Sequence, residues 1–123
     1  MELAEQILDF WYAGNVDDKR KAWFKKDPAF DDEIRSRFGK DVERAAVGEL
    51  DAMADDPLGA LALLILLDQF PRNLYRNDAK TFAADGKALE IAKISIAKGH
   101  DNSLTTVQKI FFYLPFEHSE TLE

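Results

Sequence analysis

Cysteine is absent from this sequence, and its absence removes several kinds of chemistry from consideration. A chain without thiols forms no disulfide, binds no zinc through thiolates and has no cysteine nucleophile. The sequence also lacks a glycine-rich phosphate-binding loop, a Gly-x-Ser-x-Gly nucleophile elbow and a His-Glu-x-x-His pair. No motif that specifies a common catalytic mechanism is therefore present.

Long apolar runs are missing as well. The longest uninterrupted one, Ala60 to Leu67, has eight residues, whereas a membrane-spanning helix needs about 20. Residues 1–6 show no basic stretch leading into an apolar region with a small-residue cleavage site, so we expect no secretory signal. These features predict a chain that does not enter a membrane and that works in the cytoplasm.

Basic residues are fewer than acidic ones. Sixteen Lys and Arg against 23 Asp and Glu give a net charge of −7 at neutral pH, which repels nucleic-acid phosphates and anionic lipids. The segment from Lys19 to Lys26 does interleave cations with aromatic residues, as proteins that bind single-stranded nucleic acid do. At this net charge we interpret it as a solvated helix face with Trp23 and Phe24 turned inward, and nucleic acid is not an expected partner.

Apolar residues are plentiful and recur at helical spacing. Hydrophobic residues make up 46% of the 123-residue chain, which is enough for one core, and no strand-like alternation bounded by turn residues occurs. We therefore predict an all-α fold, in a single domain over 1–123, around a buried central helix. The predicted helices span about 2–12, 18–24, 28–54, 57–70, 78–98 and 106–122.

Capping residues and prolines set several of these boundaries. Asp27 and Asp56 each precede a proline, which is the pattern of an N-cap followed by the first helical position. The stretch Thr105-Thr106-Val107-Gln108 has the spacing of a capping box. Because Pro71 lacks an N–H and disfavours helix in the residue before it, we expect the central helix to end near Phe70.

The first candidate site, Asp68-Gln69-Phe70-Pro71-Arg72-Asn73, follows the most apolar part of the chain. Asp68 lies four residues before Arg72, close enough for a carboxylate–guanidinium pair. One interpretation is a polar plug whose charges persist because they are paired. The other is a groove in which Arg72 and Asn73, with Asp68 and Gln69, bind a small polar or anionic ligand.

The second candidate site lies within residues 114–120 and places a histidine among carboxylates. The side chains that could perform acid–base or metal chemistry there are Glu117, His118 and Glu120. A metal centre would need further ligands such as Asp68 or His100, so neither a metal nor a cofactor is predicted. The alternative role is capping and anchoring of the last helix. His100 itself is expected in an exposed turn.

Together with three other stretches, these two sites resemble a known family. The other stretches are Leu8-Asp9-Phe10-Trp11, the segment from Trp23-Phe24-Lys25-Lys26-Asp27 through Phe30-Asp31, and Arg37-Phe38-Gly39. Over essentially the whole chain the sequence is similar to the bacterial and fungal family known as domain of unknown function nine-two-four. The resemblance implies a tetratricopeptide-like fold, a right-handed array of antiparallel helical hairpins, with further helices after the position of Glu123. It implies no particular activity.

These observations predict a non-enzymatic helical scaffold or binding module. The alternative is a small-molecule enzyme, or an anion- or metabolite-binding protein, with a site around Arg72, Glu117 and His118. In either case we expect the two candidate sites to touch, through a contact of Arg72 with Glu117 or Glu120. The large apolar residues of 106–123 also predict that a partner protein, or a second copy in a homodimer, packs against that segment.

Overall fold

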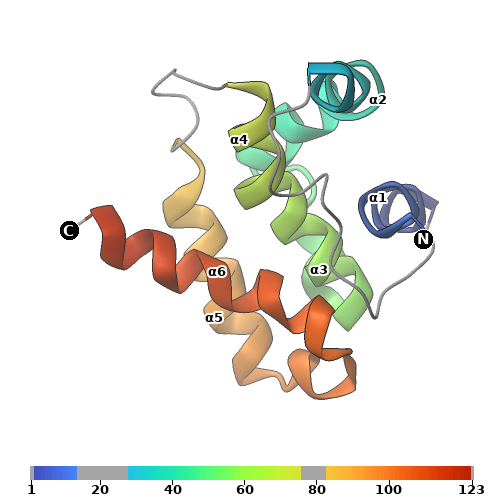
Figure 1. The fold of residues 1–123 in the computed structure, drawn as a ribbon. Coiled ribbons are helices and arrows are strands. Elements are labelled where there is room, and N and C mark those ends of the chain that lie inside the picture. Colours follow the sequence, from blue (N-terminus) through green and yellow to red (C-terminus); the bar gives the residue numbers. More distant parts are fainter. Residues whose placement is uncertain (1, 14–27, 76–82, 123) are drawn as a thin grey trace.

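The chain folds into a set of packed helices, shown as a computed structural model in Figure 1. The structure describes residues 2–13, 28–75 and 83–122, with side chains as far as Glu117. The elements are α1 (Glu2–Tyr12), α2 (Pro28–Ala46), η2 (Asp51–Asp55), α3 (Pro57–Leu64), η3 (Ile65–Gln69), α4 (Phe70–Leu74), α5 (Asp85–Ala97), η5 (His100–Ser103) and α6 (Thr106–Leu122). No strand occurs in the described ranges, and the predicted all-α fold is confirmed. The predicted helix over 18–24 and the cap at Asp27 lie outside these ranges.

Helix α3 lies at the centre of the fold, as predicted. It contacts α1, α5, α6 and η2, and Figure 1 shows it running through the middle of the molecule. The run from Ala60 to Leu67 is completely buried. A helix that is apolar on every side needs neighbours on every side, and these elements supply them. Despite this run, no helix among the described residues is long and apolar enough to cross a membrane.

The helix containing Pro71 does not end at Phe70, so that prediction was wrong. The chain passes from α3 through the π-helical turn η3 and continues helically as α4. The N–H of Phe70 donates to the carbonyl of Ile65, five residues earlier. Proline is disfavoured inside a regular helix because it has no N–H and its ring clashes with the carbonyl four residues before it. The wider π turn changes that register just before Pro71, so the chain keeps its helical path.

The single helix predicted over 28–54 is also wrong, because it is interrupted. Helix α2 ends at Ala46, and the chain turns through Gly48, whose φ is +91°, before entering the short 3₁₀ helix η2. Glycine adopts this left-handed conformation without the steric penalty that a Cβ atom would cause. The turn therefore depends on Gly48, whereas Gly39 lies inside α2.

These two glycines allow a matched test of that explanation. Gly48→Ala should lower the free energy of unfolding by about 1–2 kcal/mol, because alanine is strained at positive φ. Gly39→Ala should raise it by up to about 1 kcal/mol, because alanine favours a helix interior. The methyl group added at Gly39 would meet only Arg35 Cγ, at 3.9 Å. Urea denaturation of both variants measures the two changes, and changes of the same sign would contradict the explanation.

Two of the predicted helix caps are present. At the start of α3, Asp56 Oδ1 accepts a hydrogen bond of 2.8 Å from the N–H of Gly59. Before α6, the N–H of Gln108 donates to Thr105 Oγ1 at 3.1 Å, and the N–H of Thr105 donates to Gln108 Oε1 at 3.0 Å. This reciprocal pair is a complete capping box. The caps satisfy backbone N–H groups that have no partner within their own helices.

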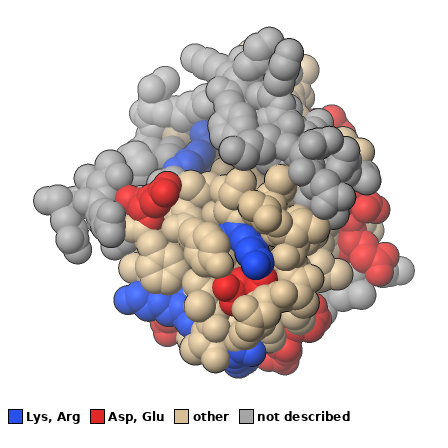
Figure 2. Space-filling model, turned by 60° about the horizontal axis from the view of Figure 1, so that its bottom comes forward, with Lys and Arg blue, Asp and Glu red and all other residues tan. Residues whose placement is uncertain are grey.

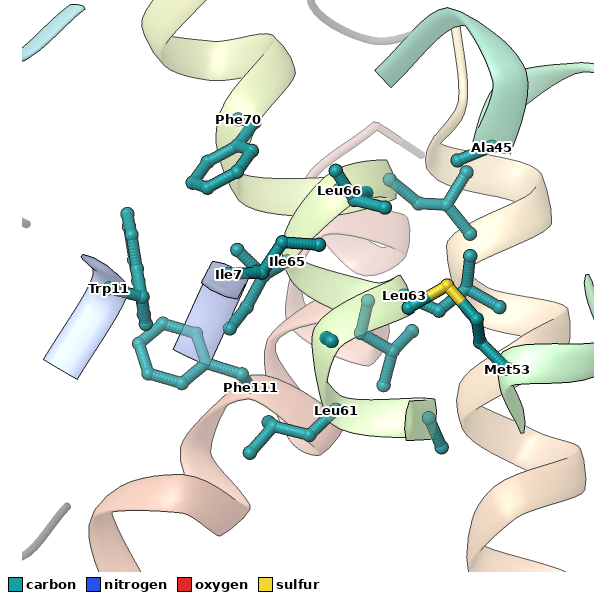
Figure 3. Packing of buried hydrophobic residues seen from close by; sticks show 14 of the residues in the cluster. Ile7, Trp11, Ala45, Met53, Leu61, Leu63, Ile65, Leu66, Phe70 and Phe111 are labelled. Carbon is teal, nitrogen blue, oxygen red and sulfur yellow. The ribbon is translucent and has the colours of Figure 1, made fainter. Parts of the chain in front are cut away.

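An aromatic cluster joins four of the helices. Its rings are Phe10, Trp11, Phe30, Phe38, Phe70 and Phe111. Phe10 stacks on Phe30 with ring centroids 5.0 Å apart. Trp11 meets Phe70 and Phe111 edge to face at 5.7 and 5.5 Å, as Figure 3 shows. The family-like stretches in α1, α2 and α4 therefore contribute to the packing of the core.

Some of the apolar residues of α6 are buried in the core, and others are partly or largely exposed to solvent. Phe111 and Phe112 are 3% and 0% exposed, whereas Tyr113 is 42% exposed. Leu114 and Phe116 are half-buried against the core. The apolar surface that the predicted homodimer would use is therefore smaller than the sequence indicated, and the homodimer itself stays a prediction.

Candidate functional site

A group of charged side chains is enclosed where α4 meets α5. Arg72 donates to both carboxylate oxygens of Asp85 at 3.0 Å, and its Nη1 also donates to Asp68 Oδ1 at 3.3 Å. Gln69 donates to the other oxygen of Asp68 at 2.8 Å. The side chains of Asp68 and Asp85 are only 1% and 7% exposed. We call Asp68, Gln69, Arg72 and Asp85 the Arg72 cluster.

Local structure brings both carboxylates to Arg72. Asp68 lies one helical turn before it, and Arg72 Nη1 also donates to the backbone oxygen of Asp68 at 2.6 Å. Asp85 is the first residue of α5, where the helix dipole favours a negative charge. The continuous helix predicted over 78–98 is wrong, because residues 83 and 84 form a turn before Asp85. The part predicted over 78–82 lies outside the described residues.

The bidentate partner of Arg72 is Asp85, which the sequence did not indicate. Glu117 is exposed on α6, and the predicted contact of Arg72 with Glu117 or Glu120 stays a prediction. The side chain of Glu120 lies outside the described residues. An aspartate at the start of a helix is a common feature that specifies no distant partner, so sequence reasoning had no signal for this pair.

Asn73 takes part in a second buried contact. Its amide donates to Asp31 at 2.9 Å, and both residues are only 8% exposed. This hydrogen bond connects α4 to the first turn of α2. Sequence reasoning missed Asp31, although it belongs to a family-like stretch, because nothing in the pattern pairs it with a residue 42 positions away.

These contacts favour the polar-plug interpretation of the first candidate site. The Arg72 side chain is 24% exposed and is engaged by Asp68 and Asp85. An anionic ligand would have to displace a carboxylate and leave it buried without this cation, which is unfavourable. The amides of Gln69 and Asn73 donate to aspartates inside the fold. The arrangement is suited to holding helices together.

The second candidate site is described only in part. Glu117 is exposed, and the side chains of His118 and Glu120 lie outside the described residues. Within the part of the chain that the structure describes, no group of three or more His, Cys, Asp or Glu side chains is placed to hold a metal ion. Acid–base chemistry at this site therefore stays a prediction.

His100 is not the exposed turn residue that the sequence indicated. It is 9% exposed, and its Nε2 lies 3.0 Å from the carbonyl oxygen of Ala54, so the side chain connects η5 to η2. The expectation failed because the position of His100 after Gly99 indicates only a turn. Whether its side chain is buried depends on the contact with η2, which is distant in the sequence.

Two tyrosines have raised pKa values for structural reasons. The hydrogen bond that Tyr113 donates to Asp101 at 2.8 Å is the main cause of the raised pKa of Tyr113, with smaller effects from burial and the charge of Asp101. Burial raises the pKa of Tyr12. Both hydroxyls therefore stay protonated near neutral pH, and neither is prepared to act as a base.

A partly open groove of about 290 Å³ lies between the C-terminal half of α2 and α4. We call it the α2–α4 groove, and it is lined by Val42, Glu43, Ala46, Val47, Pro71, Tyr75, Ala83 and Ala84. Apart from Glu43 and the hydroxyl of Tyr75, these side chains are apolar. Of the two candidate sites, only Pro71 is in this lining, and none of their polar or charged residues is. The sequence offered no signal for the groove, because its walls come from three separate segments of the chain.

Charged residues of both signs are mixed on the face drawn in Figure 2. Lys and Arg side chains there lie beside Asp or Glu, or singly among uncharged residues. On the described part of this face we see no continuous basic stripe of the kind that follows a phosphate backbone.

Comparisons with known proteins agree with this description. Residues 7–123 match the family described as bacterial protein of unknown function, DUF924. Among solved structures, the chain is similar to the protein of unknown function ATU0120 from Agrobacterium tumefaciens, with a TM-score of 0.88 and 42% sequence identity. The match covers 95% of this chain and 64% of that one, so the chain spans less than two thirds of the neighbour's length. The comparison with curated proteins found no match.

Proposed function

The chain belongs to the bacterial DUF924 family of unknown function, and from its geometry we propose that it is a non-catalytic helical module that binds a small ligand in the α2–α4 groove. The observation that carries this proposal is a groove of about 290 Å³ with almost entirely apolar walls. Pockets for small molecules usually hold about 300–1,000 Å³ and combine apolar walls with a few polar groups. The groove is close to the lower end of that range, which favours a ligand of modest size.

Buried contacts support the walls of the groove. The hydrogen bond from Asn73 to Asp31 fastens α4 to α2. The Arg72 cluster fastens α4 to α5, directly after Ala83 and Ala84. A site whose walls are held before binding loses less conformational entropy when a ligand enters. We therefore assign a supporting role to the Arg72 cluster and the binding role to the groove.

The alternative function, an enzyme or anion-binding protein that uses Arg72, Glu117 and His118, has less support. Arg72 is engaged by two nearly buried aspartates, and displacing either would be costly. Neither the groove nor the hollow next to it is lined by Arg72 or Glu117 in the described structure.

The groove proposal predicts where a small apolar probe binds. In NMR titrations with 1-hexanol, we expect the largest amide shift changes at Val42, Ala46, Val47 and Ala84. Ala46→Leu should weaken binding at least about fivefold, because the larger side chain occupies the groove. Ala97→Leu is the matched control, since Ala97 is exposed and ends α5 as Ala46 ends α2. Shift changes that ignore these residues, or equal effects of both substitutions, would overturn the proposal.

The partner and location expected from the sequence are also proposals. A homodimer or partner protein would pack on the 106–123 segment, where Tyr113 is exposed and Phe116 is half-buried. Light scattering at micromolar concentration tests the homodimer. Cell fractionation tests the cytoplasmic location.

A further inference from the structure

We propose that the ligand of the α2–α4 groove is an amphipathic organic cation, with its apolar body in the groove and its ammonium group beside the carboxylate of Glu43. This inference rests on the proposed function and names the ligand class of the same site. It follows from the carboxylate of Glu43 in the groove lining and from the ion pairs that neighbouring charged residues form with each other.

Glu43 is the charged residue in the groove lining. Its side chain is exposed, and no ion pair or hydrogen bond of its carboxylate occurs among the described residues. The other carboxylates nearby are occupied, since Asp41 and Glu49 both pair with Arg44, at 3.3 and 3.2 Å. Among the described residues, the groove therefore presents one carboxylate without an ion-pair partner next to an apolar surface.

Lys40 lies near this charge but forms no contact ion pair with it among the described residues. It lies three residues before Glu43 and lines, with Glu43, an adjoining hollow of about 420 Å³, but it does not line the groove itself. No ion pair joins Lys40 to Glu43 in the described structure. An anionic ligand in the groove would meet the carboxylate of Glu43 as a like charge, whereas a cation would pair with it.

The charge of the whole chain acts in the same direction. A net charge of −7 raises the local concentration of cations and lowers that of anions near the surface. The apolar walls then distinguish an amphipathic cation from a simple metal ion, because only the former can remove apolar surface from water. A primary ammonium group on a short alkyl chain has the required chemistry.

The experiment compares three probes of equal chain length: hexylammonium, 1-hexanol and hexanoate. Their dissociation constants are measured by NMR titration with the wild-type chain, Glu43→Gln and Glu90→Gln. Glu90 is the matched control, because it is an exposed glutamate that lines neither hollow, so both substitutions change the net charge equally. Melting curves verify that both variants are folded.

We expect Glu43→Gln to weaken hexylammonium binding about three- to fivefold, the effect of losing one solvent-exposed charge pair. Hexanol binding should change less than about twofold in the same variant, and Glu90→Gln should leave both constants nearly unchanged. Added salt should weaken hexylammonium binding but not hexanol binding, and hexanoate should bind more weakly than hexanol.

The outcomes separate the two proposals. If hexanol binds in the groove but Glu43→Gln leaves hexylammonium binding unchanged, the cation inference is overturned and the proposed function stands. Tighter binding of hexanoate than of hexylammonium would also overturn it and indicate recognition by Lys40. If none of the probes binds in the groove, both proposals fail.

Discussion

Replacing Arg72 by alanine should lower the free energy of unfolding by about 3–5 kcal/mol. The guanidinium is shared by Asp68 and Asp85, whose side chains are 1% and 7% exposed, and the substitution leaves both without it. Breaking a buried pair by removing one partner is costly because the remaining charge stays in a poorly solvated site. Arg72 also donates to the backbone oxygen of Asp68, so the π turn loses a hydrogen bond.

Urea denaturation measures this loss of stability. An exposed arginine serves as a control, and a double-mutant cycle measures the coupling of Arg72 to Asp85. Arg35→Ala should cost less than about 1 kcal/mol, because its ion pair with Asp32 is 56% and 75% exposed and its hydrogen bond to the carbonyl of Leu74, at 3.3 Å, is exposed as well. In a double-mutant cycle, Arg72→Ala combined with Asp85→Ala should cost about 1–3 kcal/mol less than the sum of the two single changes. If Arg72→Ala cost no more than Arg35→Ala, the polar-plug interpretation would be wrong and a ligand role for Arg72 would regain support.

Leu64→Ala should lower the free energy of unfolding by about 2–5 kcal/mol. Leu64 ends α3 and is 0% exposed in the centre of the core. The substitution loses the transfer free energy of the removed carbon atoms and leaves a cavity that the surrounding helices can only partly close. Figure 3 draws part of this core, with labelled side chains of α1, α2, η2 and α6 around α3.

Leu58→Ala is the control for this prediction. Leu58 belongs to the same helix but is 50% exposed, so the same truncation there should change stability by no more than about 0.5 kcal/mol. Thermal or urea denaturation of the two variants gives the comparison. Similar losses at both positions would mean that α3 is not the buried centre of the fold.

Features that depend on a few neighbouring residues were predictable from the sequence. The caps at Asp56 and at Thr105 with Gln108 were, because a capping side chain bonds to backbone only two or three residues away. The buried position of the run from Ala60 to Leu67 was predictable too, since an apolar surface on all sides of a helix has no other stable place in water.

Features that depend on distant contacts were not predictable in the same way. A proline such as Pro71 usually ends a helix, but here the π-helical turn η3 precedes it and the chain continues helically as α4. Asp31 and Asp85 gave no sign in the sequence of their contacts with Asn73 and Arg72, because the sequence does not state which surfaces meet.

By itself, the sequence determined the helical class, the buried central segment and the residues of the first polar motif, since each follows from spacing and local chemistry. Only the tertiary structure decided which side chains that motif contacts. It enclosed Arg72 between two aspartates, and it left Glu43 beside an apolar groove built from three separate segments. The physical reason is that burial and pairing are properties of surfaces in contact, and those contacts form between residues far apart in the chain.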